Sequence, residues 1–427
     1  MTRPSTTPEG SILNPIHTPK AQRPLATWIF RAFGRLAILA VLGVAALFGA
    51  LWVEHRAAIT LPQPTGAFAV GRDIYDWADD KTLDTLAPVP GTKRELLVWV
   101  WYPSDAGQSP ATDDYLPAQM RPAAAPASGP LRLLTRDLSR VHSHSIPDAN
   151  VSSRQQSYPV VVMRAGASSE VWNYSTLAED LASHGYVVVG FDAPYRTFAV
   201  TFPDGRVMRR TPENNPERCE GQQRPQQTRC VSRVMSAWMS DIAFVLDRLL
   251  QLNTSKATGK FKGRLDLARL GVFGHSFGGA TAAQFCHDDN RCKAAIDVDG
   301  RPFGSVIQDS LHQPFLFLMS DHSHESDPEK IMADIQSIYD RLPPERRLQV
   351  TIRGANHFLF SDDGALLKSH IVMRTLRAFG VVGIDGRRQL AVTVYCIHSF
   401  FDAYLKGLST SRLEIASPLY PEIEVME

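Results

Sequence analysis

Residues 270–280 read Leu-Gly-Val-Phe-Gly-His-Ser-Phe-Gly-Gly-Ala and place Ser276 between Gly274 and Gly278. In a Gly-x-Ser-x-Gly run, a sharp turn from a strand into a helix lifts the serine hydroxyl out of the fold and leaves no room for side chains two residues away. The residues before the turn are apolar, and small residues follow it, as in a helix packed closely on a sheet. Ser276 is therefore predicted to be a catalytic nucleophile; the alternative is a glycine-rich turn with an incidental serine.

Around this turn, strand and helix patterns alternate from Tyr158 onward, which indicates a mostly parallel central sheet with helices on both faces. The first strand is predicted at 95–102, before an irregular excursion at 103–157 with one short helix near 131–138. A long polar loop is predicted at 194–229. Further strands are predicted at 160–163, 185–191, 270–273, 294–298, 314–319 and 348–352, and helices at 175–184, 231–252, 365–379 and 387–406.

Composition is that of a globular chain of 427 residues, with 44% hydrophobic and 21% charged residues. Lys plus Arg number 45 and Asp plus Glu 44, so there is no net field to attract nucleic acid. A nucleic-acid partner is not expected.

The N-terminal region contains 18 consecutive uncharged residues at 36–53, ten of them Leu, Ile, Val or Phe. As a helix this run is about 27 Å long, close to the thickness of a bilayer core. The preceding positive charges (Lys20, Arg23, Arg31 and Arg35) predict that residues 1–35 stay cytoplasmic and that the chain after Glu54 is exported. A cleaved signal peptide and a buried core helix are the alternatives to an uncleaved signal anchor.

Four regions are predicted from these patterns. They are a disordered cytoplasmic tail at 1–35, a transmembrane signal anchor at 36–53, a linker and lead-in at 54–90, and one α/β domain at 91–427.

The five cysteines agree with export to an oxidising compartment. Cys219 and Cys230 bracket a polar loop, and Cys286 and Cys292 bracket a five-residue stretch, so each pair is spaced for a local disulfide. Cys396 lies in a helical apolar pattern and is expected to be a small buried hydrophobe. The chain has no Cys-x-x-Cys spacing that would indicate a zinc or redox motif.

His357 is the predicted catalytic base. A serine hydroxyl needs a base to take its proton, and that base needs an acid to hold its tautomer. Behind an elbow of this kind the acid and the base follow later strands, in the order Ser, Asp, His. His357 follows the strand at 348–352 in Thr-Ile-Arg-Gly-Ala-Asn-His-Phe, where Gly354 frees the backbone to bring the ring over the elbow.

The sequence motifs alone do not decide which carboxylate is the acid of the triad. Asp299 ends the strand at 294–298, Asp321 follows the next strand, and Asp297 lies deeper on the same side of its strand as Asp299. Other titratable residues have simpler interpretations. His275 is expected to be structural, and His322 and His324 lie in a polar loop that is more typical of a solvated segment than of a metal site.

Two backbone N–H groups are needed to hold the oxyanion. The residue after the nucleophile, Phe277, is one predicted donor, at the start of a helix. Ala167, in the loop Arg164-Ala-Gly-Ala-Ser168 after an early strand, is the other.

Taken together, these segments resemble the plasma-type platelet-activating factor acetylhydrolase family of the α/β-hydrolase fold, with related dienelactone-hydrolase-like proteins. The resemblance extends over about residues 95–406. It rests on Tyr-Pro-Val-Val-Val at 158–162, Asp-Leu-Ala-Ser-His-Gly-Tyr-Val-Val at 180–188, Gly-His-Ser-Phe-Gly-Gly at 274–279, Ile-Asp-Val-Asp at 296–299 and Thr-Ile-Arg-Gly-x-x-His at 351–357. It implies an α/β-hydrolase fold and Asp299, rather than Asp321, as the acid.

This chain departs from the family's pattern at two points. The oxyanion loop carries Arg164-Ala165-Gly166 where the family usually has Ser-His-Gly, and Gly300-Arg301 replaces the Trp that commonly follows the acid. The family's substrate is therefore not transferred from the resemblance.

The sequence predicts a membrane-tethered serine esterase that cleaves short-acyl lipid or phospholipid-like esters through an acyl-enzyme. No cofactor and no metal are expected, and the partners are a small-molecule or lipid ester and the membrane. The alternatives are an acyltransferase with the same triad and a catalytically inactive, membrane-anchored binding protein.

Overall fold

The computed structural model of the chain describes residues 1–2, 25–105, 113–124, 129–220, 222–254, 259–320, 327–409 and 417–426. Within this part of the chain, two compact units form, Met1–Ala50 and Leu51–Glu427.

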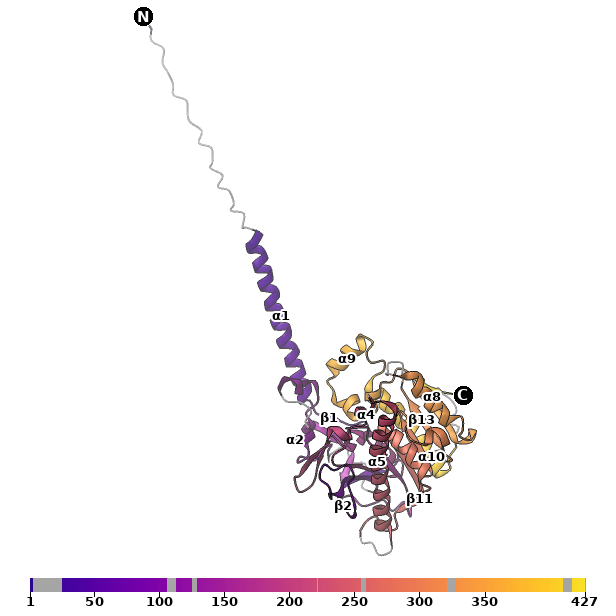
Figure 1. Cartoon of the computed structure of the whole chain (residues 1–427). Coiled ribbons are helices and arrows are strands. Elements are labelled where there is room, and N and C mark those ends of the chain that lie inside the picture. The colour runs from indigo at the N-terminus through magenta and orange to yellow at the C-terminus, as the bar shows by residue number, and fades with distance from the viewer. Residues whose placement is uncertain are drawn as a thin grey trace. The chain divides into compact units, whose positions relative to one another are not determined.

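The second unit is built on a ten-stranded sheet in the order β15-β14-β13-β12-β11-β7-β8-β3-β2-β6. Figure 1 labels β2, β11 and β13 of this sheet. The six neighbouring strands from β14 to β8 are all parallel, whereas β3 pairs antiparallel with both β8 and β2, and β15 pairs antiparallel with β14. The mostly parallel sheet is thus confirmed. The strands are β2 (Ala69–Leu83), β3 (Lys93–Ser104), β6 (Ser145–Pro147), β7 (Tyr158–Arg164), β8 (Val187–Asp192), β11 (Leu265–His275), β12 (Ala294–Val298), β13 (Phe315–Met319), β14 (Arg347–Ile352) and β15 (Ile423–Val425).

Helices cover both faces of this sheet, as predicted. Alternate residues of β7 enter two separate cores, with Val161 and Met163 in one and Val160 and Val162 in the other. Side chains of α3 and α10 complete the first core, and side chains of α5, α6 and α8 complete the second. These helices are α3 (Ser175–Ser183), α5 (Arg224–Asn253), α6 (Phe277–Asp288), α8 (Pro328–Tyr339) and α10 (Gly386–Lys406).

The prediction of a linker and lead-in at 54–90 is wrong, because this segment contains β2, a full strand of the sheet. β2 also comes before the strand at 95–102 that was expected to be the first. Charged residues hide the strand pattern: Arg72 and Asp73 are buried, but each has partners that only the folded chain supplies. Arg72 donates to Asp113, and Asp73 accepts from the Tyr102 hydroxyl at 2.9 Å.

The irregular segments contain more structure than the sequence indicates. A small sheet joins β1 (Ile59–Thr60), β5 (Val141–Ser143) and β4 (Asp113–Asp114), and 3₁₀ turns at Gly129–Leu134 and Leu138–Arg140 replace the short helix expected near 131–138. The excursion also carries α2 (Arg121–Ala124). The loop at 194–229 contains β9 (Ala199–Thr201), β10 (Val207–Arg209) and α4 (Glu217–Glu220).

The helix predicted at 365–379 is broken in the structure. A π-helical turn ends at Leu367, and α9 (His370–Ala378) begins three residues later. Glu54 separates the two, because its carboxylate accepts from the Ser369 hydroxyl and the His370 N–H, both at 2.5 Å. Ser369 is the N-cap of α9, since its hydroxyl accepts from the Val372 N–H at 3.5 Å, and Glu54, more than 300 residues away, reinforces this cap.

The N-terminal helix α1 (Leu25–Arg56) contains the run predicted to span a membrane. Its segment Trp28–Arg56 is long and apolar enough to cross a bilayer, a property that a signal sequence shares. Residues 25–35 of the predicted disordered tail are helical, which corrects that boundary. Residues 3–24 lie outside the described part of the chain.

Both predicted disulfides are confirmed, Cys219–Cys230 and Cys286–Cys292, and Cys396 is a buried free thiol. The first bridge ties α4 to α5 across a sequence separation of 11 residues.

We expect the double substitution Cys219→Ser/Cys230→Ser to lower the free energy of unfolding by about 3 kcal/mol, because the loop then adds conformational freedom to the unfolded chain. Chemical denaturation under oxidising conditions measures the loss. The matched control is Cys286→Ser/Cys292→Ser, whose separation of 6 residues predicts a slightly smaller loss. Unchanged stability in the first variant would contradict the prediction.

Candidate active site

Ser276 stands at the turn between β11 and α6 with a φ of 57° and a ψ of −127°. A non-glycine residue in this region is strained, and such strain persists only where the surroundings fix it. The two flanking glycines explain how the surroundings hold Ser276 in this conformation. A Cβ on Gly274 would collide with the backbone of Gly278, and a Cβ on Gly278 would collide with the carbonyl oxygen of Ala165. The tight turn inferred from the sequence is thus present.

Asp299 lies beside this turn because the two strands that carry the residues are in register. His275 of β11 pairs with Val298 of β12, so Ser276 and Asp299 each stand one residue beyond a paired position. The Ser276 N–H donates to the Val298 carbonyl at 2.8 Å, which fixes the turn to the end of β12.

The side chain of Asp299 is fully buried, and its partners hold it in one orientation. Its Oδ1 accepts from the Ser320 N–H and its Oδ2 from the Ser320 hydroxyl, both at 2.6 Å. The same Oδ2 lies 2.8 Å from Nδ1 of His357, which follows β14. With the His357 proton on Nδ1, Nε2 is the acceptor of the neutral ring.

One surface cavity, here called the Ser276 cavity, contains both Ser276 and His357. The rings of His275 and His357 are also adjacent, with centroids 4.5 Å apart. Polar and charged residues form much of the remaining wall, namely Ser168, Ser169, Glu170, Asn173, Glu217, Ser361, Asp363 and Lys368.

The two predicted oxyanion donors come together in the folded chain. Ala167 packs against the apolar cluster that contains Phe277, and it lines the Ser276 cavity. Phe277 is the first residue of α6, where an N–H has no acceptor within the helix. The loop is also close to the elbow, because a Cβ on Gly166 would lie 3.4 Å from the Cβ of Ser276.

The sequence did not indicate Tyr174, which connects the oxyanion loop to the elbow. Its hydroxyl accepts from the Gly166 N–H at 3.2 Å and lies 2.8 Å from Nδ1 of His275. Burial lowers the pKa of His275 to about 3, and the neighbouring His357 adds to the effect. His275 is thus neutral near pH 7, and its tautomer decides whether Nδ1 or the Tyr174 hydroxyl donates in this hydrogen bond. Tyr174 lies 101 residues from His275, and no local pattern marks such a pair.

We expect Tyr174→Phe to lower kcat for ester hydrolysis by roughly tenfold with little change in KM, because the buried Gly166 N–H loses its acceptor and the loop shifts. Steady-state kinetics with a chromogenic acetate ester measure both constants. Tyr186→Phe is the matched control: it also removes a buried hydroxyl, 2.8 Å from Asp402, but outside the Ser276 cavity. Equal losses of kcat in the two variants would assign Tyr174 to stability alone.

Arg164, the departure from the family's oxyanion loop, is buried rather than directed into solvent. Its guanidinium lies between the rings of Phe191 and Trp238, 4.2 and 4.3 Å from their centroids, and donates to the Phe191 carbonyl at 3.0 Å. Burial lowers its pKa to about 10, so the group keeps its charge at neutral pH. The Arg164 side chain therefore packs in the protein interior and stabilises the start of the loop at 164–168.

The other candidate residues lie either in the core or in segments outside the described part of the chain. The carboxylate of Asp297 accepts from the Gly300 N–H at 2.8 Å and lies within the core. Asp321, His322 and His324 fall outside the described residues, as does any metal site they would form.

Comparison with known proteins identifies the family of the chain. A family model described as platelet-activating factor acetylhydrolase, isoform II matches residues 54–408. A probable 1-alkyl-2-acetylglycerophosphocholine esterase of Arthroderma benhamiae is 24% identical over 86% of this chain and 94% of its own length. The platelet-activating factor acetylhydrolase of Cavia porcellus is 27% identical over 48% of this chain and 49% of its own length.

Among solved structures, a ferulic acid esterase from Streptomyces cinnamoneus is similar, with a TM-score of 0.68 and 27% sequence identity. The match covers 87% of this chain and all of that chain. The α/β-hydrolase fold is therefore confirmed. With a family model matching most of its length, the chain belongs to the platelet-activating factor acetylhydrolase, isoform II family.

Proposed function

We propose that this member of an ester-hydrolase family cleaves carboxylic esters with Ser276 as nucleophile, His357 as base and Asp299 as the acid that orients the base. The observation that carries the proposal is the 2.8 Å contact between His357 and the buried Asp299, in the cavity that Ser276 lines. A buried carboxylate on Nδ1 holds the tautomer whose Nε2 takes the serine proton.

In the proposed reaction, Ser276 Oγ attacks the ester carbonyl as its proton passes to His357. The N–H groups of Phe277 and Ala167 hold the negative charge of the tetrahedral intermediate, and His357 then protonates the leaving alcohol. Water attacks the resulting acyl-serine, with His357 again acting as base, and releases the acid. Asp299 keeps its negative charge throughout and stabilises the protonated ring.

The proposed substrates are short-acyl lipid esters of the phospholipid type. The names of the two relatives support an acetyl ester of a glycerophospholipid. The cavity wall supports a short acyl group on independent grounds, because Glu170, Asn173 and Asp363 line it and a long alkyl chain would desolvate such groups.

A series of nitrophenyl esters from acetate to dodecanoate, together with 1-alkyl-2-acetylglycerophosphocholine and its long-chain diacyl counterpart, tests this assignment. We expect kcat/KM to be at least about tenfold higher for the nitrophenyl acetate than for the dodecanoate, and for the 2-acetyl phospholipid than for its long-chain diacyl counterpart. Equal or higher values for the long-chain members would reject the short-acyl proposal while leaving the esterase activity standing.

We further propose that α1 anchors the protein in a membrane, with the catalytic unit on the extracytoplasmic side. Arg31 and Arg35 stand before the apolar run, and two disulfides agree with an oxidising compartment. Membrane fractionation after an alkaline wash, with intact mass spectrometry of the retained protein, tests both parts. A soluble product that lacks residues 1–53 would show a cleaved signal peptide instead.

A further inference from the structure

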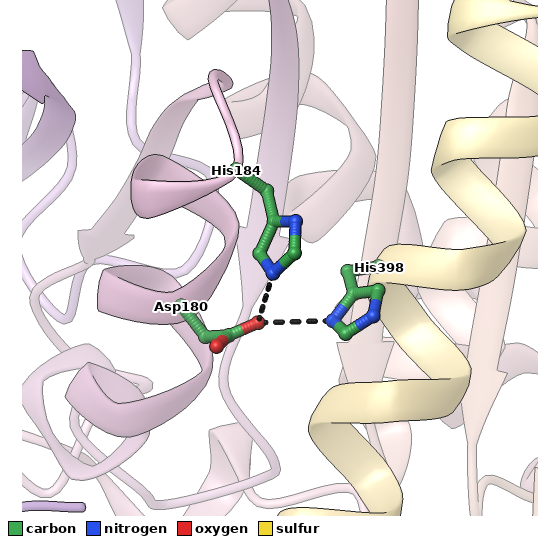
Figure 2. Close-up of side chains that lie close together, drawn as sticks. All are labelled: Asp180, His184 and His398. Carbon is green, nitrogen blue, oxygen red and sulfur yellow. Dashed lines mark hydrogen bonds and ion pairs between the residues drawn. The ribbon is translucent and has the colours of Figure 1, made fainter. Parts of the chain in front are cut away.

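Three potential metal ligands meet on the face of the sheet covered by α3 and α10. Asp180 lies on α3, His184 follows one turn later at the end of this helix, and His398 lies on α10. Figure 2 shows both imidazoles directed at the same carboxylate oxygen of Asp180. These residues are not among those that line the Ser276 cavity.

We propose that Asp180, His184 and His398 bind a divalent transition-metal ion, with Zn²⁺ as the best match to two imidazoles and one carboxylate. Oδ2 of Asp180 lies 3.1 Å from Nδ1 of His398 and 3.7 Å from Nε2 of His184. Ligand atoms about 2.0–2.1 Å from a tetrahedral ion are about 3.3 Å apart. The two observed distances lie on either side of this value, and all three atoms fall within 4.8 Å of one another.

The His184 side chain must rotate for all three ligand atoms to reach one ion. The rings of His184 and His398 are stacked, with centroids 4.1 Å apart and planes 22° from parallel. An ion in the plane of His398 therefore requires the His184 ring to turn toward it. His184 is able to turn because its side chain is 21% exposed, and this exposure also provides the ion with an entry path.

The second oxygen of Asp180 is held as the outer shell of a metal site requires. Oδ1 accepts from both the N–H and the hydroxyl of Thr65, at 2.8 and 2.7 Å, which turns Oδ2 toward the imidazoles. The Thr65 hydroxyl also lies 2.9 Å from Nε2 of His184. Thr65 thus contacts both Asp180 and His184.

The local charge favours a cation. The Asp180 carboxylate faces both imidazoles and brings the negative charge that a divalent cation needs. Lys406 brings one positive charge nearby, and Asp402, 2.9 Å from its ammonium, balances it.

A bound ion would join two segments that are distant in sequence, the end of α3 and the middle of α10. It would therefore stabilise the folded state over the unfolded state, by an amount that rises with the logarithm of the ion concentration above Kd. Because the site is separate from the Ser276 cavity, we expect ester hydrolysis to proceed without the ion.

The test uses the full-length protein in detergent, freed of metal by a chelator. Co²⁺ serves as the probe because its visible absorption becomes intense in tetrahedral sites, and Zn²⁺ then displaces it. We expect one equivalent of Co²⁺ to bind, one equivalent of Zn²⁺ to displace it, and Zn²⁺ to raise Tm. His184→Ala and His398→Asn should each weaken binding by about 100-fold or more, since each removes one direct ligand. Both should also abolish the Tm increase.

The variants are chosen so that folding does not confuse the result. The amide introduced by His398→Asn retains a side-chain N–H that can donate to Asp180, and His184 is partly exposed, so both proteins should fold, as circular dichroism would verify. The matched control is His287→Ala, which removes another histidine with two nearby carboxylates, Asp288 and Asp309. It should leave Co²⁺ binding unchanged.

Two outcomes would overturn the proposal. The first is wild-type protein that binds no Co²⁺ and shows no Tm increase with Zn²⁺, in which case the cluster is a hydrogen-bonded contact between α3 and α10. The second is binding that persists in both His184→Ala and His398→Asn or that disappears in His287→Ala, because the ion then occupies another site.

Discussion

Ser276→Ala is expected to lower kcat for ester hydrolysis by about 10⁴- to 10⁶-fold, to a level set by the oxyanion donors and substrate binding alone. The substitution removes the only atom that forms the proposed acyl-enzyme. It should also abolish labelling by a fluorophosphonate probe, which reacts with activated serines. The fold should persist, because the backbone bond from Ser276 N to the Val298 carbonyl is unaffected by the side chain.

The matched control for this result is Ser361→Ala, which removes another serine hydroxyl from the wall of the same cavity. The Ser361 hydroxyl donates to the Phe358 carbonyl at 3.1 Å, so it is already committed to a backbone partner. Labelling and kcat should remain close to the wild-type values. Labelling that survives in Ser276→Ala and disappears in Ser361→Ala would move the nucleophile to Ser361. Absence of labelling in the wild type would favour a catalytically inactive binding protein.

Asp299→Asn is expected to lower kcat by about 10³- to 10⁴-fold, in line with the corresponding substitution in the serine-protease triad. Both oxygens of Asp299 are acceptors, toward the backbone and hydroxyl of Ser320 and toward Nδ1 of His357. Asparagine keeps one acceptor for Ser320 N–H but presents an amide N–H₂ to His357. The ring then takes the tautomer with the proton on Nε2, which is unable to accept the serine proton.

Two comparisons separate this role from a loss of stability. In Asp297→Asn the amide oxygen still accepts from the Gly300 N–H, so kcat should fall far less than in Asp299→Asn. Asp321→Asn tests the other carboxylate that the sequence allowed, and we expect little change. A fall of about 10³-fold in Asp321→Asn with near-normal activity in Asp299→Asn would assign the acid to Asp321 and end the present proposal.

The strands were predicted well wherever a buried apolar run made the pattern local. The strand at 294–298 has the predicted bounds, because all five of its side chains are buried, four of them in the two cores, and none occupies a surface position. β2 was missed for the opposite reason. Its buried Arg72 and Asp73 are polar in sequence, and they become compatible with a strand only when Asp113 and Tyr102 provide partners.

Helix ends were less predictable, because the periodicity of apolar residues does not mark them. α5 begins at Arg224 rather than at 231, because its first two turns are polar and a proline near its start does not disturb them. The break before α9 involves Glu54, which lies near the start of the second unit and more than 300 residues from α9 in the sequence. Neither end is encoded by the periodicity of nearby apolar residues.

The sequence by itself determined the strand-turn-helix around Ser276 and the predominantly parallel sheet. Glycine spacing and runs of apolar residues act over a few positions, and such short-range effects are visible in the chain. The tertiary structure alone decided which groups meet there. It brings Asp299 to His357 across 58 positions and Tyr174 to His275 across 101. Hydrogen bonds of this kind depend on strand register and helix packing, which arise only when the whole sheet has formed.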